Sequence, residues 1–440
     1  MWWLRTKLAE PANRWFFYGE KDIINNMIKP QTLKGFRDFL PGEMRKRQYV
    51  IDILKSVFES YGFEPLETPA LEYEEILLGK YGEEGDKLMY RFKDLGGRKV
   101  ALRYDQTVPL ARVISQYQDK LPLPFKRYQI QPVWRAENPQ RGRFREFLQC
   151  DIDIVGSNSP YVDAEIIACI SKCLDQLGFK TYKILINDRA IFNENYIKTS
   201  FDIPINAVPL VFRAIDKIKK IGKDRVQEEF IKSGFTKEQA EEILQKVDEA
   251  KPSPALEENI FTALKDLGVS QDKFKFEPTL VRGLDYYTEM VFEVEVEGID
   301  LSIVGGGRYD NLIGIFAGKA IPAVGGSFGF DRLIEAMDQL GLFPADLSTT
   351  KALITIFSQE LADKSTEIVK RLREENINVE LWLDPQVKLE KQLKYADQKG
   401  IPYVVIIGPE EASKNEVTIK ILKTGEQKSV PVEKIKEVTK

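Results

Sequence analysis

The sequence predicts an α+β protein in which a sheet-forming part is interrupted by a helical insertion and followed by a separate α/β unit. Two strand-like stretches, residues 125–135 and 144–155, flank a segment with Asn138-Pro139 and Gly142, and this pattern predicts a β-hairpin. Short charged helical patterns replace the strands between about residues 187 and 275. After Pro344 strand and helix patterns alternate, which is typical of an α/β unit.

The order of elements follows from local signals. A helix is expected over residues 44–61, because Val50, Leu54 and Phe58 recur on one face and Gly62 supplies a stop. Residues 63–71 contain two prolines and suit an edge strand. The other expected elements are strands 99–104, 280–282, 289–296 and 300–304, helices 165–177 and 331–340, three short helices at 213–221, 223–232 and 236–250, and, in the last unit, strands 352–357, 378–381, 402–407 and 417–422 with helices ending at 375 and spanning 387–399.

The composition excludes several kinds of chemistry. The chain has 440 residues and no histidine, so no Ser-His or Cys-His pair, imidazole base or Cys₂His₂ zinc site can form, and no metal site is predicted. The three cysteines, Cys150, Cys169 and Cys173, are too few for a disulfide framework and are expected to be buried, reduced thiols. The net charge of −4 argues against a polybasic nucleic-acid binder but leaves a local RNA-binding surface open.

No membrane partner is expected, because no apolar run approaches ~18 residues. Residues 1–28 are rich in aromatic side chains, but Arg5, Lys7, Glu10 and Arg14 interrupt them. That pattern fits neither a signal peptide nor a transit segment, so we expect an N-terminal extension of unclear role or a start site assigned upstream of Met27.

Arginines among apolar strand residues indicate an anionic ligand. Phosphate-loop and dinucleotide fingerprints are missing from the sequence, and the glycine triplet at 305–307 indicates a tight turn or a close approach by a ligand or another chain element. The arginines concerned are Arg135, Arg143, Arg145, Arg282 and Arg332. Each of them could instead be a solvated or ion-paired surface group, but several together suggest a polyphosphate.

Polar and aromatic residues nearby indicate a second, cationic or zwitterionic ligand. Gln149 and Asp153 are four apart on one predicted strand and therefore share a face. The remaining candidates are Asp105, Gln106, Thr107, Glu137, Tyr286, Tyr287 and Tyr309. The residues alone therefore predict a site for a nucleotide plus a small cationic or zwitterionic molecule.

These segments, taken in order, resemble the class II aminoacyl-tRNA synthetases and specifically the histidyl-tRNA synthetase family, over residues 29–436. GFRDFLP at 35–41 resembles the family's opening, and the helix leading into Pro69 resembles motif 1. VWRAENPQRGRFREF at 133–147 resembles motif 2, and GSFGFDRL at 326–333 resembles motif 3. LVRGLDYYT at 280–288 and GGGRYD at 305–310 are more specific to the histidine family.

The resemblance implies ATP-dependent ligation of L-histidine to tRNA(His) through a histidyl-adenylate, with Mg²⁺ arriving with ATP. It also implies a cytoplasmic homodimer with no DNA partner. The fold implied is an antiparallel catalytic sheet with flanking helices, in two parts at 29–186 and 276–344, a helical insertion at 187–275, and an anticodon-binding domain at 350–440.

The resemblance also implies individual roles. Arg135 and Arg282 would be catalytic, contacting the α-phosphate and the substrate carboxylate. ATP would be bound further by Glu137 at the adenine, by Arg143, and by Arg332 at the γ-phosphate. Histidine would be bound by Asp105, Gln106, Thr107, Gln149, Asp153, Arg282, Tyr286, Tyr287 and Tyr309, with Asp105, Thr107 and Gln149 at the α-amino group and Asp153 and Tyr287 at the imidazole. Gln140 and Arg145 would contact the tRNA acceptor end.

Some positions depart from the family pattern. Many relatives have Glu where Asp105 and Asp153 stand, and Asn138 replaces an arginine near the tRNA acceptor end, which puts the contact to the extra 5′ guanosine of the tRNA in doubt. A non-catalytic regulatory paralogue would lack the C-terminal domain and the ATP-site arginines, and a tRNA-sensor domain would be attached to a kinase. Neither alternative fits this chain. Three explanations for the missing histidines stay open. An enzyme that makes histidyl-tRNA can be translated during histidine shortage if it contains no histidine, histidine can be scarce across the whole genome, or the residues can have been removed in the laboratory.

Overall fold

The computed structural model describes residues 29–140, 142–188, 201, 203–204, 207–281 and 286–436. The N-terminal extension, the proposed start at Met27 and the predicted catalytic Arg282 lie outside these residues. No described helix is long and apolar enough to cross a membrane.

The centre of the fold is an eight-stranded sheet in the order β1-β5-β6-β11-β10-β9-β7-β8. Its strands are β1 Glu64–Pro65, β5 Phe125–Trp134, β6 Glu146–Val155, β7 Tyr182–Asp188, β8 Phe274–Phe276, β9 Met290–Val296, β10 Val304–Arg308 and β11 Ala323–Gly329. All neighbours are antiparallel except the two edge pairs, β1 with β5 and β7 with β8. The predicted hairpin and antiparallel sheet are confirmed, and β6 pairs with β11 although they are far apart in sequence.

Two details of the predicted strands are wrong. The strand expected at 300–304 begins only at Val304 and continues through the glycine triplet, since Gly305–Gly307 pair with β9 and β11. The strand expected at 280–282 is not formed by its described part, because Leu280 and Val281 are outside any strand. The stretch 63–71 contains only the two-residue strand β1 and the start of β2, because its prolines limit the ladder.

One layer of helices builds the main core against the sheet. α2 (Pro41–Ser60) begins with proline at its N-terminus and buries Val50, Leu54 and Phe58, as its periodicity predicts. α6 (Pro160–Gln176) is capped by the Ser159 side chain and packs on α2 and β11. The cysteines are buried and free, which confirms the prediction made for them. α14 (Phe330–Gln339) follows β11 directly.

The residues that follow β1 in the sequence form a smaller three-stranded sheet in the order β2-β4-β3. Its elements are β2 Leu71–Tyr73, α3 Glu74–Leu77, α4 Gly82–Lys87, β3 Arg91–Lys93 and β4 Lys99–Leu102. α5 (Thr107–Tyr117) and α13 (Gly314–Ala317) share a further hydrophobic cluster with it.

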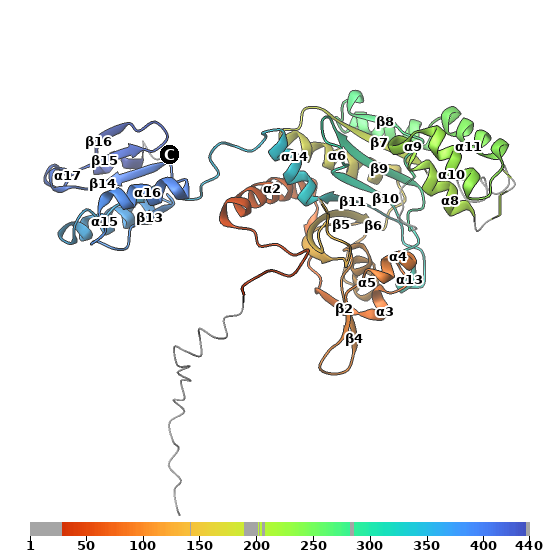
Figure 1. The fold of residues 1–440 in the computed structure, drawn as a ribbon, viewed down its shortest axis with the longest axis horizontal. Coiled ribbons are helices and arrows are strands. Elements are labelled where there is room, and N and C mark those ends of the chain that lie inside the picture. Colours follow the sequence, from red (N-terminus) through yellow and green to blue (C-terminus); the bar gives the residue numbers. More distant parts are fainter. Residues whose placement is uncertain are drawn as a thin grey trace, which may run out of the picture.

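The insertion has its own helical core. Its helices are α8 Val208–Ile215, α9 Ile218–Ile221, α10 Lys223–Lys232 and α11 Lys237–Glu249, and Thr236 and Gln239 form a capping box at the start of α11. The following π-helical turn Ala255–Phe261 and α12 (Thr262–Asp266) return to the main core, where Leu256 and Leu264 are buried. Figure 1 shows the green insertion helices at the end of the large sheet that carries β7 and β8.

The C-terminal residues form a third sheet, which has five strands in the order β13-β12-β14-β15-β16. Its elements are β12 Ala352–Ile354, α15 Ala362–Glu374, β13 Val379–Leu381, α16 Leu389–Lys399, β14 Tyr403–Ile406, α17 Pro409–Lys414, β15 Glu416–Ile421 and β16 Gln427–Pro431. Its apolar side chains form clusters of their own, and Figure 1 shows it in blue, joined to the rest by the segment after α14. The α/β alternation is confirmed, although α17 and β16 are additional.

Candidate active site

A cavity of about 360 Å³ opens on the large sheet, within the range of small-molecule sites. β6, β10 and β11 supply its floor, and the loop from Arg135 to Phe144, Tyr81 and Tyr286-Tyr287 supply its walls. The cavity therefore collects residues from both halves of the chain, brought together by the pairing of β6 with β11.

Three neighbouring side chains on the floor of the cavity each have a buried oxygen that accepts no hydrogen bond. Gln149, Asp151 and Asp153 alternate along β6 and face the cavity. Gln149 Oε1, Asp151 Oδ1 and Asp153 Oδ2 are buried and have no hydrogen-bond partner. Arg127 Nη2 lies 2.8 Å from Asp153 Oδ2 in an ion pair whose geometry does not make a hydrogen bond. Because unsatisfied buried acceptors are costly, this row indicates a ligand rich in N–H donors.

Burial changes the titration of these acids. It raises the pKa of Asp151 to about 7, although the nearby Arg127 charge acts in the opposite direction. The pKa values of Asp153 and Asp105 are also raised by burial, while hydrogen bonds from tyrosine hydroxyls favour their charged forms. Tyr309 donates to Asp153 Oδ1, and Tyr81 donates to Asp105 Oδ1 at 2.8 Å.

Glycines make room for these side chains. A Cβ on Gly325 would lie 1.9 Å from Asp153 Oδ1, so only glycine lets this carboxylate lie across β11. A Cβ on Gly307 would lie 2.6 Å from the Met290 carbonyl oxygen and 2.9 Å from the Tyr287 ring. The close approach predicted for the glycine triplet is thus made by other parts of the chain.

Aromatic rings and arginines form the other side of the cavity. The Arg135 guanidinium lies over Tyr104 and Phe147, with 4.4 and 5.1 Å to the ring centroids, and its Nε donates to the Tyr104 carbonyl at 3.1 Å. Arg332 Nη1 donates to the Ser302 carbonyl at 3.1 Å. Arg143 is half-exposed and pairs with Glu137 at 3.5 Å. These contacts hold guanidinium groups at the wall, where a polyphosphate could meet them.

The start of α14 is anchored from the N-terminal part of the chain. Asp331, next to Arg332, accepts hydrogen bonds from Arg37 at 2.9 Å and from Arg47 at 2.6 Å. The Arg37 guanidinium in turn lies 3.2 Å from the centroid of the Phe144 ring. This network fixes the helix turn that carries Arg332 and links it to the wall of the cavity.

The comparisons with known proteins agree with this geometry. The family description for histidyl-tRNA synthetase matches residues 35–333, and that for an anticodon binding domain matches residues 351–440. The chain belongs to the histidyl-tRNA synthetase family. The antiparallel sheet, helical insertion and C-terminal α/β domain are thus those of a class II synthetase.

Individual relatives show how complete the likeness is. A histidine–tRNA ligase of Cytophaga hutchinsonii is 39% identical, with 93% of this chain and 99% of that protein covered. One of Aeropyrum pernix is 40% identical, with 92% and 96% covered. The crystal structure of histidyl-tRNA synthetase from a Nostoc species matches with a TM-score of 0.82 and 32% identity, covering 94% of this chain and all of that one.

Most of the predicted site residues line the cavity together: Asp105, Thr107, Arg135, Glu137, Arg143, Gln149, Asp153, Tyr286, Tyr287, Tyr309 and Arg332. Gln106 does not line it, and its amide instead donates to the carbonyls of Gln131 at 2.9 Å and Gln149 at 3.4 Å. Arg145 donates to the Glu137 carbonyl at 3.0 Å, and Gln140 is exposed on the hairpin loop.

Among the site residues that the sequence prediction missed are Tyr81, Arg127 and Asp151. The alternation that places Gln149 and Asp153 on one face of β6 also places Asp151 there, so a signal for Asp151 existed. Nothing local distinguishes Tyr81 or Arg127, because their roles depend on Asp105 and Asp153, which are distant in sequence.

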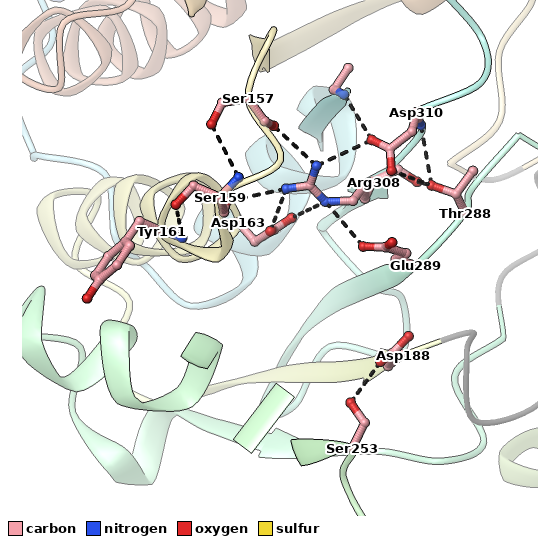
Figure 2. Close-up of polar contacts among 11 residues, drawn as sticks. Ser157, Ser159, Tyr161, Asp163, Asp188, Ser253, Thr288, Glu289, Arg308 and Asp310 are labelled. Carbon is pink, nitrogen blue, oxygen red and sulfur yellow. Dashed lines mark hydrogen bonds and ion pairs between the residues drawn. The ribbon is translucent and has the colours of Figure 1, made fainter. Parts of the chain in front are cut away.

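Arg308 is the centre of a buried polar network next to the site residue Tyr309, and Figure 2 shows this network. It is 2% exposed and donates to Asp163 on α6 through Nη2 at 2.6 Å and Nε at 3.1 Å. Its Nη1 donates to Asp310 at 3.3 Å, and Asp310 also accepts from Thr288 and from the Ala323 N–H. The Arg308 network therefore ties α6, β10 and β11 together around Tyr309, whose hydroxyl reaches Asp153.

Proposed function

We propose that this protein is a histidine–tRNA ligase that joins L-histidine to tRNA(His), with ATP as the second substrate. The observation that carries the proposal is the row of buried oxygen atoms on β6 that accept no hydrogen bond from the protein. L-Histidine supplies the missing donors, because it combines an α-ammonium group with ring N–H groups. The family and the relatives' names support the same activity.

The first step forms histidyl-adenylate. A carboxylate oxygen of histidine attacks the α-phosphorus of ATP, the bond to the bridging oxygen of the β-phosphate breaks, and pyrophosphate leaves. Negative charge develops on the α-phosphate oxygens, and a guanidinium held in place in advance stabilises it. Arg135 is held in this way by Tyr104 and Phe147, and Arg282 is the second catalytic cation that we propose.

The second step transfers histidine to tRNA. A hydroxyl of the terminal adenosine attacks the carbonyl carbon, and AMP leaves. No side chain becomes covalently attached, so the protein needs only to bind, orient and stabilise charge.

The substrate contacts follow the cavity. Asp105, Thr107 and Gln149 would hold the α-ammonium group, while Asp153 and Tyr287 would bind the imidazole, with Tyr286 and Tyr309 as aromatic walls. Glu137 would face the adenine, and Arg143 and Arg332 the phosphates. Gln140 and Arg145 would meet the tRNA acceptor end from the hairpin loop.

Magnesium would enter with ATP. No group of three or more metal-ligating side chains exists among the described residues. The carboxylates of the cavity outside β6 and the Asp105 loop are Glu137, Glu293 and Asp331. Glu137 pairs with Arg143, and Asp331 accepts from two arginines. The phosphates would therefore be the main ligands of Mg²⁺, which would neutralise their charge.

The larger organisation is proposed on the same basis. Residues 29–186 and 276–344 would be the catalytic domain, 187–275 the insertion and 350–440 the anticodon-binding domain of a cytoplasmic enzyme. A homodimer is supported by large apolar side chains on the small sheet, since Leu71, Tyr73 and Phe92 are 43%, 52% and 48% exposed. Light scattering of wild type and Leu71→Asp tests it, because the substitution should dissociate a dimer formed through this sheet.

Histidine-dependent exchange of pyrophosphate into ATP, followed by charging of a tRNA pool, tests the activity. Asp153→Asn should raise the KM for histidine far more than that for ATP, because the site would lose its pairing with a buried polar group. Equal effects on both substrates would make Asp153 structural. Charging of tRNA(His) with and without the extra 5′ guanosine shows whether Asn138 still permits recognition of that nucleotide.

A further inference from the structure

Asp151 is the buried carboxylate of the cavity that the protein itself compensates least. It is 3% exposed, and its Oδ1 has no hydrogen-bond partner. Asp153, by contrast, has the Tyr309 hydroxyl on one oxygen and Arg127 beside the other, and the Tyr81 hydroxyl and the Val108 N–H bind Asp105. The described residues place no cation within ion-pair distance of Asp151.

The position of Asp151 puts it beside the substrate. A strand rises about 3.3 Å per residue, so Asp151 lies midway between Gln149 and Asp153 on the same face. A histidine with its α-amino group at Gln149 and its ring at Asp153 must therefore pass over Asp151. Ser327 lies opposite Asp151 on β11, where its hydroxyl oxygen accepts from the Gln149 amide at 3.3 Å, and Asp151 Oδ1 stays open.

Asp151 lies midway between the ring end and the amino end, so the acceptors already present at each end decide which part of the substrate needs it. Burial is the main reason that its pKa is raised, and the nearby acids Asp153 and Asp105 add to the increase. The amino end also has acceptors of its own, including the open Gln149 Oε1.

We propose that Asp151 binds a ring nitrogen of the substrate imidazole, as a second carboxylate next to Asp153 that determines specificity for histidine. This proposal rests on the proposed function. One ring nitrogen donates its N–H to the Asp151 carboxylate, and the other ring nitrogen lies at Asp153. Each nitrogen of the imidazole therefore has a carboxyl partner. The positive charge of Arg127 lies beside Asp153 and partly neutralises it. This reduces the electrostatic repulsion between Asp151 and Asp153.

Asp151→Asn tests the proposal, because it keeps the shape of the side chain but removes its charge. Pyrophosphate exchange should show a KM for histidine at least ~10-fold higher, as expected for loss of a charge-assisted hydrogen bond, and a KM for ATP within about twofold of wild type. Asp52→Asn, on the exposed side of α2, is the matched control and should change neither constant.

The decisive comparison uses β-(2-thienyl)alanine as a competitive inhibitor, because it keeps the α-amino and carboxylate groups but has no ring nitrogen. Its inhibition constant should be the same for wild type and Asp151→Asn within about twofold. Equal weakening of both ligands would overturn the proposal by assigning Asp151 to the α-amino group or to structure, and an unchanged KM for histidine would also overturn it.

Two controls keep these results interpretable. If Asp151→Asn does not fold, as judged by its circular dichroism and melting temperature, Asp151→Ser replaces it in the same comparison. Failure of the proposed function would be seen separately, because wild type itself would then lack histidine-dependent exchange.

Discussion

Replacing Gly325 by alanine should disable histidine binding while leaving the fold in place. The added Cβ would lie 1.9 Å from Asp153 Oδ1, 2.6 Å from its Cγ and 2.9 Å from the Ile152 carbonyl oxygen, so the carboxylate takes most of the displacement and the backbone only about 0.1 Å. Carbon and oxygen do not approach below about 3 Å without bonding, so the carboxylate must move by about 1 Å or more. That movement breaks its alignment with Tyr309 and Arg127, and a displacement of this size in a binding constellation costs on the order of 10²-fold.

Pyrophosphate exchange at varied histidine and varied ATP measures the effect. We expect the KM for histidine of Gly325→Ala to rise on the order of 10²-fold and the KM for ATP to change little. Gly42→Ala is the matched control, because a Cβ at Gly42 meets nothing within 4 Å. A Gly325→Ala enzyme with native circular dichroism and a near-normal KM for histidine would refute the assignment of Asp153 to the imidazole.

Three other variants test the remaining parts of the mechanism. Arg282→Ala should slow adenylate formation by at least ~10²-fold, the scale of losing one transition-state donor, and near-normal exchange would contradict this role. Removal of residues 350–440 should abolish most tRNA charging but spare adenylate formation, whereas unchanged charging would exclude anticodon recognition by this domain. Asp151 has a folded pKa of about 7 against 3.8 in the unfolded chain, so its ionisation destabilises the apoprotein progressively between pH 4 and 7. Asp151→Asn should therefore gain stability over wild type across that window, up to about 4 kcal/mol at pH 8 in urea unfolding, and a gain that does not vary with pH would contradict the ionised state.

The β5–β6 hairpin could be predicted because its signals are local. Alternating apolar residues, Asn138-Pro139 and Gly142 lie within one short stretch, and the motif 2 residues come with it. The glycine triplet also indicated a close approach, but its place within β10 depends on pairing with β9 and β11. Sequence alone does not give that pairing, since β11 must return across the whole insertion to lie beside β6.

The charged interior was harder to predict than the fold. In the sequence Arg127 is one cation in an amphipathic strand, and only the completed sheet shows that it is fully buried against Asp153. Arg308 lies in a motif that pointed to Tyr309, yet its partner Asp163 comes from the start of α6. Such residues gain their roles from partners that are distant in the chain. A single sequence does not show which distant residues come into contact.

The absence of histidine is consistent with this site and leads to a last prediction. Every role that we propose falls to Arg, Asp, Glu, Gln, Thr or Tyr, so no step requires an imidazole of the protein. A ligase that makes histidyl-tRNA and contains no histidine can still be translated when charged tRNA(His) is scarce, whereas a histidine-containing enzyme would deepen its own shortage. Synthesis of this protein under histidine starvation should therefore outlast that of a variant with five surface histidines, measured by pulse labelling. Equal decay of the two would end the self-supply explanation, and equally histidine-free synthetases elsewhere in the same genome would favour general scarcity instead.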